Sequence, residues 1–189
     1  MKHISYLGYI WNPVRLRWIQ NNARNRRSIE NQIRKYADPS AIALVSCSKA
    51  KAFDQSTRAI AARSAYCSPL FDKSKAWAEN RDLQWGILSA KYGIIRPVQE
   101  IQDYDLTINE LSNKQKQAWR DNVREQLTAN DVRIKKVYVL AGKAYVDAIN
   151  PVLEELDIEI EEPLKGKQIG ERLSALTNDN QFWRLNDGK

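Results

Sequence analysis

Histidine and cysteine are scarce in this chain of 189 residues, which contains one histidine, His3, and two cysteines, Cys47 and Cys67. Because His3 stands alone near the N-terminus, a histidine general base and a histidine-ligated metal are strongly disfavoured. The two thiols have neither the spacing nor the histidine neighbours of a zinc site, and they do not make a disulfide framework. We therefore expect no metal and no other cofactor, and acid–base chemistry has to use carboxylates, lysine or tyrosine.

The chain also lacks any apolar run that approaches the roughly 20 residues of a membrane-spanning helix. Its first eleven residues have no long apolar core and no small-residue cleavage site, so we do not expect them to form a signal peptide. Together with the scarcity of cysteine, these absences predict a soluble, monomeric protein of the reducing cytoplasm. The length is sufficient for one α/β domain with its own core.

Basic residues exceed acidic ones, and the excess is concentrated at one end of the chain. The formal net charge is +7, with a sequence pI of about 9.4. Before Pro39 there are eight basic residues against the two acids Glu30 and Asp38, which accounts for +6 of that charge. Such a distribution favours an anionic partner, although a basic surface also commonly serves only solubility.

The basic segment predicts one long helix from Pro13 to Ala37, because Pro13 suits a first helical turn and Asp38-Pro39 ends the pattern. Its arginines are interleaved with asparagines. A solvated helix face is the default explanation of such a charge run, but arginine and asparagine are also the residue types that contact phosphates and base edges. We expect residues 1–38 to form a basic helical arm that binds DNA.

Three short apolar runs predict buried strands, at Ala41–Val45, Leu83–Leu88 and Val137–Leu140. After each run come small polar residues, a lysine within five positions, and then a helical pattern. Repeated strand–loop–helix passages predict an α/β fold with a central, mainly parallel sheet flanked by helices. Right-handed crossovers place all three loops at one edge of the sheet, so residues 39–189 should form a single domain with a composite site at that edge.

The loop after the first run, Ser46–Lys51, contains serines and cations, which are ingredients of an oxyanion or phosphate cradle without the glycines of a Walker loop. Such a loop is more often a helix cap, in which Ser46 or Ser48 satisfies backbone donors. Cys47 is better explained as a small buried filler than as a nucleophile, since no suitable base stands near it in sequence.

The segment after the second run, from Ser89 to Thr107, combines small, cationic, phenolic and acidic side chains. At the end of a parallel strand, this composition indicates a site for a polar substrate. A well hydrogen-bonded connection with nothing bound is the alternative. Further along, residues 163–170 carry two glycines and two lysines, which form either a phosphate-binding turn or a tight turn with solvated lysines.

Four motifs in this order resemble the YaaA-like superfamily. They are LVSCSK at residues 44–49, YCSPLF at 66–71, ILSAKYG at 87–93 with Pro97 after it, and YDLT at 104–107. The superfamily includes the peroxide-stress protein YaaA, many small bacterial and phage domains, and a domain of archaeosine synthases. The resemblance covers roughly Ala41 to Leu176, and LSAKYGIIRP is its most specific part. YaaA is basic at the segment matching Asp105, whereas the small domains carry an acid there, so this chain is more similar to the small domains.

The resemblance implies a nucleic-acid-directed α/β fold, since some relatives are similar in layout to DNA glycosylases. The resulting hypothesis is hydrolysis of the N-glycosidic bond of a modified base in double-stranded DNA, with the target nucleotide extruded. A carboxylate activates water and stabilises the positive charge on the sugar, which needs neither metal nor histidine. By analogy, such an enzyme would protect a bacterium from phage DNA. The alternatives are a non-catalytic DNA-binding stress protein and a nucleoside or deoxyribosyl transferase.

Under this hypothesis Asp105 is the first candidate for the catalytic carboxylate, and Asp103 is the second. The residues expected to hold phosphate, the leaving base or the extruded nucleotide are Ser46, Ser48, Lys49, Tyr66, Ser68, Ser89, Lys91, Tyr92, Tyr104, Gly142 and Lys143. Taken alone, Tyr66 and Ser68 are explained equally well by packing and capping. The residues expected to contact the DNA backbone are Arg24, Arg26, Arg27, Lys165 and Lys167.

Overall fold

The computed structural model describes residues 23–24, 39–53, 59–129 and 132–186, together with the backbone of three short strands between residues 5 and 20. These strands are β1 (Ser5–Tyr6), β2 (Tyr9–Asn12) and β3 (Arg17–Gln20), which pair antiparallel in that order. Within the described ranges, no helix has both the length and the apolar character needed to cross a membrane.

The prediction of one helix from Pro13 to Ala37 is wrong over its first part, because β3 lies inside that range. β3 pairs with β2 in a register that sets Trp18 opposite Trp11. Both segments are rich in aromatic and β-branched residues, which favour strands once a partner strand is present. Arg24 is exposed, whereas Arg26, Arg27 and most of the expected helix lie outside the described residues. Contact between the basic arm and DNA stays a prediction.

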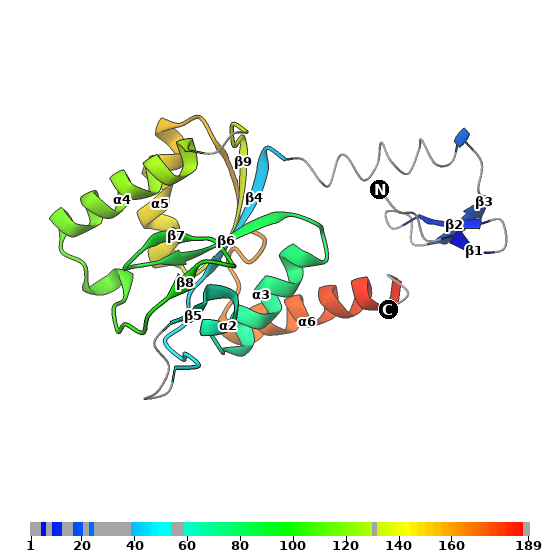
Figure 1. Ribbon diagram of the computed structural model, residues 1–189, viewed down its shortest axis with the longest axis horizontal. Coiled ribbons are helices and arrows are strands. Elements are labelled where there is room, and N and C mark those ends of the chain that lie inside the picture. The colour runs from blue at the N-terminus through cyan, green and yellow to red at the C-terminus, as the bar shows by residue number, and fades with distance from the viewer. Residues whose placement is uncertain are drawn as a thin grey trace.

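The centre of the fold is a five-stranded sheet in the order β10-β9-β4-β6-β7 (Figure 1). Its strands are β4 (Ala41–Ser46), β6 (Gln84–Ser89), β7 (Gly93–Ile95), β9 (Lys136–Leu140) and β10 (Glu159–Glu161). β4 pairs in parallel with both β6 and β9, and β9 pairs in parallel with β10, while β7 is antiparallel to β6. The prediction of a central, mainly parallel sheet is confirmed.

Helices cover both faces of this sheet and complete three layers (Figure 1). The four long helices are α3 (Pro69–Glu79), α4 (Asn113–Thr128), α5 (Lys143–Glu155) and α6 (Ile169–Asn186). Leu44 packs in one core with Trp119 of α4 and Ile149 of α5, whereas its neighbour Ala43 packs in another with Trp77 of α3 and Leu176 of α6. Because successive side chains of a strand point to opposite faces, β4 contributes to both cores.

Smaller elements precede and follow the acidic segment around Tyr104. β5 (Ile60–Ala61) pairs antiparallel with β8 (Glu100–Ile101), and the short helix α2 (Ala62–Ala65) follows β5 directly. The 3-10 helix η1 (Ile108–Glu110) begins after Thr107, whose N–H donates to the Glu110 carboxylate at 2.7 Å. The acidic segment is therefore held at both ends.

The expected helix after the second strand is replaced by a hairpin. The chain turns at Ala90–Tyr92 and returns as β7, with Gly93 paired opposite Ser89. Gly93 adopts φ +74°, a left-handed conformation that glycine adopts at little cost. A helix follows β9 at once, however, and the turn still lies at the carboxyl end of β6. The prediction that all three loops share one edge of the sheet is confirmed.

Helix α4 contacts this hairpin through two side chains. Gln126 accepts a hydrogen bond from the Ile94 N–H at 2.6 Å and donates to the Tyr92 carbonyl oxygen at 2.9 Å, and Asn122 donates to the same oxygen at 3.2 Å. A Cβ atom added at Gly93 would lie 2.4 Å from Gln126 Oε1 and 2.6 Å from Asn122 Nδ2. Position 93 therefore has neither the backbone conformation nor the space for a side chain.

We expect Gly93→Ala to lower the free energy of unfolding by about 2 kcal/mol, because it strains the left-handed backbone and displaces the two α4 side chains. Urea denaturation followed by circular dichroism measures the change. The matched control is Gly170→Ala at the start of α6, where an added Cβ meets nothing within 4 Å and stability should stay equal or rise slightly. Equal stability of Gly93→Ala and the wild type would contradict this account.

Candidate functional site

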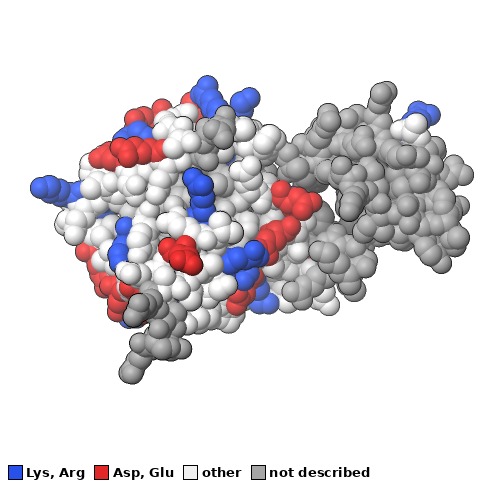
Figure 2. Space-filling model, viewed as in Figure 1, with Lys and Arg blue, Asp and Glu red and all other residues white. Residues whose placement is uncertain are grey.

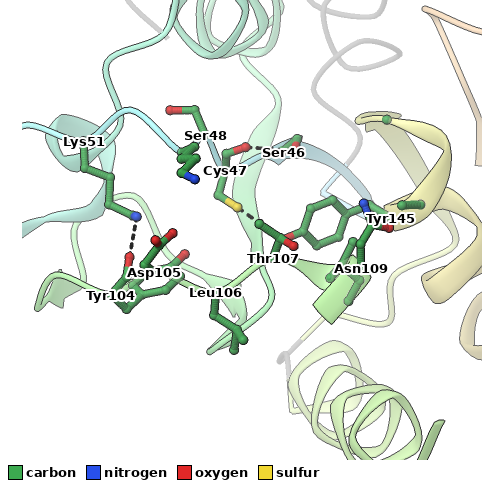
Figure 3. A pocket seen from close by; sticks show the side chains of 14 residues that line it. Ser46, Cys47, Ser48, Lys51, Tyr104, Asp105, Leu106, Thr107, Asn109 and Tyr145 are labelled. Carbon is green, nitrogen blue, oxygen red and sulfur yellow. Dashed lines mark hydrogen bonds between the residues drawn. The ribbon is translucent and has the colours of Figure 1, made fainter. Parts of the chain in front are cut away.

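A pocket of about 180 Å³ lies at the carboxyl edge of the parallel strands. Its walls come from the loop after β4, from Tyr104–Asn109, and from the beginning of α5 (Figure 3). These segments are far apart in sequence, and they meet because β4 and β9 are parallel neighbours whose carboxyl ends face the same way. A pocket therefore lies at the edge where the composite site is expected, although no residue of the turn after β6 lines it.

The hydroxyl group of Tyr104 joins three of the sequence motifs behind the pocket wall. It lies 2.8 Å from the Ser89 hydroxyl and 2.8 Å from the Tyr66 hydroxyl. Ser89 is fully buried, with 0% of its surface exposed, and Tyr66 is 2% exposed. Water does not reach these two hydroxyl groups freely, so the bonds to Tyr104 satisfy them.

The direction of these hydrogen bonds follows from the donors that surround Ser89. Ser89 Oγ accepts the N–H groups of Lys91 and Tyr92, each at 3.2 Å, so both of its lone pairs are used and its proton goes to Tyr104. The Tyr66 hydroxyl lies 2.8 Å from the Tyr104 oxygen, and donation to that oxygen satisfies the Tyr66 proton. Tyr104 then accepts twice, and the nearby Cys47 thiol is a hydrogen-bond partner for its own proton.

Burial raises the pKa of the Tyr104 hydroxyl above its ordinary value, and the nearby Cys47 thiol raises this pKa further. Burial likewise raises the pKa values of Tyr66 and Tyr145. The Tyr145 hydroxyl lies 3.2 Å from Cys47 Sγ on the pocket wall (Figure 3). All three phenols therefore remain protonated at neutral pH and serve as hydrogen-bond donors.

The aromatic rings of the site pack against protein groups. The Tyr104 and Tyr92 rings meet edge to face, with centroids 5.4 Å apart. Lys51 Nζ lies 4.5 Å from the Tyr104 centroid, and Lys91 Nζ lies 5.0 Å from the Tyr92 centroid. Since these contacts occupy the Tyr104 ring, its arrangement favours a role for the hydroxyl group over the expected stacking on a nucleotide.

The two candidate carboxylates differ in position. Asp105 is exposed and lines the pocket, and no described residue donates a hydrogen bond to its carboxylate. In Figure 3 it lies beside Tyr104 and faces the loop after β4. Asp103 instead accepts the Tyr104 N–H at 2.8 Å, has a side chain 63% exposed, and is absent from the pocket wall. The geometry therefore favours Asp105 over Asp103.

Lys51 is the charged residue among the described pocket residues that sequence reasoning missed; Thr107, Asn109 and Tyr145 also line the pocket without having been predicted. The Lys51 ammonium group donates to the Tyr104 carbonyl oxygen (Figure 3) and lies 3.9 Å from Asp103 Oδ1, and its side chain is only 9% exposed. The loop composition pointed to Ser46, Ser48 and Lys49, since a lysine at a loop end is ordinarily solvated. Lys51 forms a β-bridge with Tyr66, a contact that local sequence does not reveal.

The remaining predicted residues divide into those at the pocket and those elsewhere. Ser46, Ser48, Lys49 and Gly142 line it. Ser46 Oγ donates to the Cys47 carbonyl oxygen at 3.0 Å, and Ser48 Oγ donates to that of Ala50 at 2.7 Å, so both hydroxyl protons are already used.

Several predicted residues do not line the pocket, among them Tyr66, Ser89, Lys91 and Tyr92, which lie around the Tyr104 side chain. Ser68 caps α3 by accepting the Phe71 N–H at 3.2 Å, which is the capping role considered for it. Lys143 pairs with Asp147 at 2.7 Å, and Lys165 pairs with Glu162 at 3.0 Å. Lys167 is exposed. No three histidine, cysteine, aspartate or glutamate side chains of the described ranges cluster closely enough to hold a metal ion.

The surface of the α/β fold carries charges of both signs. After Asp38 the chain has 22 of its 30 basic residues and 21 of its 23 acidic residues. On the face drawn in Figure 2, blue and red side chains are interspersed and no broad patch of one sign forms. This face therefore offers no broad basic patch for a polyanion, and most of the net positive charge of the chain belongs to the N-terminal segment.

We expect Tyr104→Phe to lower the free energy of unfolding by about 1–3 kcal/mol, because the buried Ser89 and Tyr66 hydroxyls lose their shared partner. Tyr66→Phe leaves the bond between Ser89 and Tyr104 intact and should cost less. Chemical denaturation of both variants provides the comparison. A larger loss for Tyr66→Phe than for Tyr104→Phe would show that Tyr104 is not the centre of this network.

Residues 42–178 match the model of a family of unknown function, DUF6884. The chain is also similar to the uncharacterized protein YfjM of Bacillus subtilis (strain 168), with 31% identity over 140 residues that cover 71% of this chain and 91% of that protein. The family match contains every residue of the pocket wall and excludes β1, β2 and β3.

Proposed function

The chain belongs to DUF6884, a family of unknown function, and we propose that it hydrolyses the N-glycosidic bond of a nucleotide, with Asp105 as the catalytic carboxylate. The observation that carries this proposal is the position of Asp105, which lines the pocket, is exposed, and receives no hydrogen bond from a described residue. A pocket carboxylate that no described residue compensates suits a substrate that develops positive charge during the reaction.

The sugar develops that charge as the bond between C1′ and the base nitrogen breaks. The Asp105 carboxylate stabilises the charge and orients a water molecule, which adds its oxygen to C1′. The water proton passes to the carboxylate or to solvent, and the base leaves with the electron pair of the broken bond.

DNA with a modified base is the substrate we favour, and the support comes from outside the pocket. The resemblance to the YaaA-like superfamily points to nucleic acid, and the first 38 residues carry +6 of the net charge. A cytoplasmic location and a role against phage DNA belong to the same proposal. The free thiols of Cys47 and Cys67 are compatible with a reducing compartment.

Hydrolysis or transfer of free nucleotides is the second candidate, because the pocket is small and the visible surface has mixed charge (Figure 2). A duplex would need phosphate contacts that this face offers only sparsely, whereas one nucleotide would not. Binding of DNA without catalysis is less well supported, because the Asp105 carboxylate repels phosphate and contributes nothing to passive binding.

We expect Asp105→Asn to slow base release about a hundredfold, equivalent to roughly 3 kcal/mol, because the amide keeps the shape of the side chain and removes its charge. The assay combines a panel of modified and unmodified duplexes with alkaline cleavage of abasic sites, and free nucleotides are followed by base release. Asp147→Asn is the matched control, since Asp147 is exposed and pairs with Lys143 outside the pocket wall.

Melting temperatures should be similar for Asp105→Asn, Asp147→Asn and the wild type, because neither carboxylate is buried. Full activity of Asp105→Asn would remove the carboxylate from the mechanism. Absence of base release by the wild type from every duplex and nucleotide in the panel would refute the proposed function.

Replacing Arg24, Arg26 and Arg27 together should weaken DNA binding uniformly across sequences and reduce the slope of affinity against salt by about one unit for each phosphate that an arginine neutralises. Fluorescence anisotropy at several salt concentrations measures both effects. Replacing the exposed Lys114, Arg133 and Lys135 removes the same charge from the α/β fold and serves as the control. Equal slopes for the two triple variants would show that the arginines act only through net charge.

A further inference from the structure

We infer that Lys51 binds a phosphate group in this pocket, so that the substrate is a nucleotide unit and not a free nucleoside. The identity of the sugar and base rests on the proposed function above. The phosphate site itself rests on the surroundings of Lys51, and it extends the site to a residue that the sequence motifs did not include.

Among the described residues, the charge of Lys51 is compensated only in part. Its side chain is 9% exposed, and its carboxylate partner there, Asp103 Oδ1, is 3.9 Å away on a side chain that is 63% exposed. At that distance and exposure the ion pair is weak. Within the same part of the chain the ammonium group donates to one acceptor, the Tyr104 carbonyl oxygen, and it has three protons to donate. A buried charge of this kind is stabilised when a second anion is bound.

The pocket provides space for that anion, because Lys51 and Lys49 both line it. The hydroxyl protons of Ser46 and Ser48 are used by backbone carbonyl groups, so the two lysines are the positively charged donors that the described residues contribute to the wall. Lys49 is exposed and adds long-range attraction, whereas Lys51 is held in one place by the Tyr104 carbonyl group and ring. A fixed, partly desolvated ammonium group binds phosphate more strongly than a solvated one.

The two signs of charge in the pocket match the two ends of a nucleotide. Lys51 and Lys49 face an anion, and Asp105 faces a group that becomes positive. A nucleotide is negative at its phosphate and develops positive charge at C1′ in the proposed reaction. A nucleoside satisfies only the carboxylate and leaves the lysines without an anion, which favours the nucleotide by the energy of a charge-assisted hydrogen bond.

A purely structural Lys51 would only hold the Tyr104 carbonyl group and with it the acidic segment. That role predicts a loss of stability in Lys51→Met and no preference of the wild type for phosphorylated ligands. The inferred role predicts the preference itself. A measurement on the wild-type protein therefore separates the two explanations even if Lys51→Met fails to fold.

The test is calorimetric titration of the full chain at low salt with the four common deoxynucleoside 5′-monophosphates, the four matching nucleosides and inorganic phosphate. We expect at least one monophosphate to bind the wild type about tenfold more tightly than its nucleoside, and phosphate to compete with it. Lys51→Met should lose this preference, and Lys51→Arg should keep most of it. Lys75→Met is the matched control, because Lys75 also lies over an aromatic ring, 5.6 Å from the Phe71 centroid, and beside Asp72 at 3.3 Å.

A single-stranded oligonucleotide with the same bases distinguishes the source of the phosphate. Lys51-dependent binding of the oligonucleotide with no preference among the monomers assigns the phosphate to a strand and supports the inference. Equal binding of monophosphates and nucleosides with Lys51-independent binding of the oligonucleotide overturns it, as does a folded Lys51→Met variant with an unchanged preference. Base release that is independent of Lys51 refutes the inference and leaves the proposed function standing. Lys51-dependent binding without base release supports the inference and refutes the proposed function.

Discussion

Buried hydroxyl groups must find partners, and the hydrogen bonds at Tyr104 meet that requirement for two motifs at once. Ser89 at the end of β6 and Tyr66 before α3 both bond to the Tyr104 hydroxyl, so strand, helix and acidic segment are joined at one oxygen atom. Loss of the Tyr104 hydroxyl removes the shared partner of two buried hydroxyl groups, which makes the arrangement cooperative. Because these bonds fix the Tyr104 side chain, they also fix the backbone that carries Asp103 and Asp105.

The same residue links the inner network to the pocket. Its ring packs against Tyr92 and Lys51, its carbonyl oxygen accepts from Lys51, and its neighbour Asp105 lines the cavity. Behind the wall the hydroxyl groups satisfy one another. On the wall, Asp105 and Lys51 retain charge that the described residues compensate only in part. Tyr104 thus stands between the buried hydroxyl groups, which stabilise the fold, and the charged groups, which are available to a ligand. Such an arrangement is expected where binding residues are held by a rigid support.

The fold of residues 39–186 was largely predictable from local patterns. The runs at β4, β6 and β9 are apolar throughout because both faces of each strand are covered, and a parallel sheet follows from their spacing. Two predictions failed where local and tertiary preferences compete. The segment containing Trp18 has a helical apolar stripe but pairs with β2, and the chain after Ala90 forms a hairpin because Gly93 adopts a left-handed conformation. In both segments the pairing with another strand decides between helix and strand, and the local sequence pattern does not reveal that pairing.

The candidate site, like the fold, was predictable from the sequence only in part. Residue types and their order were enough to place Ser46, Ser48 and Lys49 at one edge, because right-handed crossovers put the loops after parallel strands on the same side. Tyr104 and Asp105 follow the antiparallel strands β7 and β8, so this rule does not place them. The sequence by itself therefore determined the sheet and the edge that bears the pocket. Only the tertiary structure decided that Asp105 lines the pocket and Asp103 does not, that the Tyr104 ring is covered, and that Lys51 is buried. The reason is physical: burial and hydrogen bonding depend on contacts between residues far apart in the chain, whereas composition and periodicity report only on neighbours.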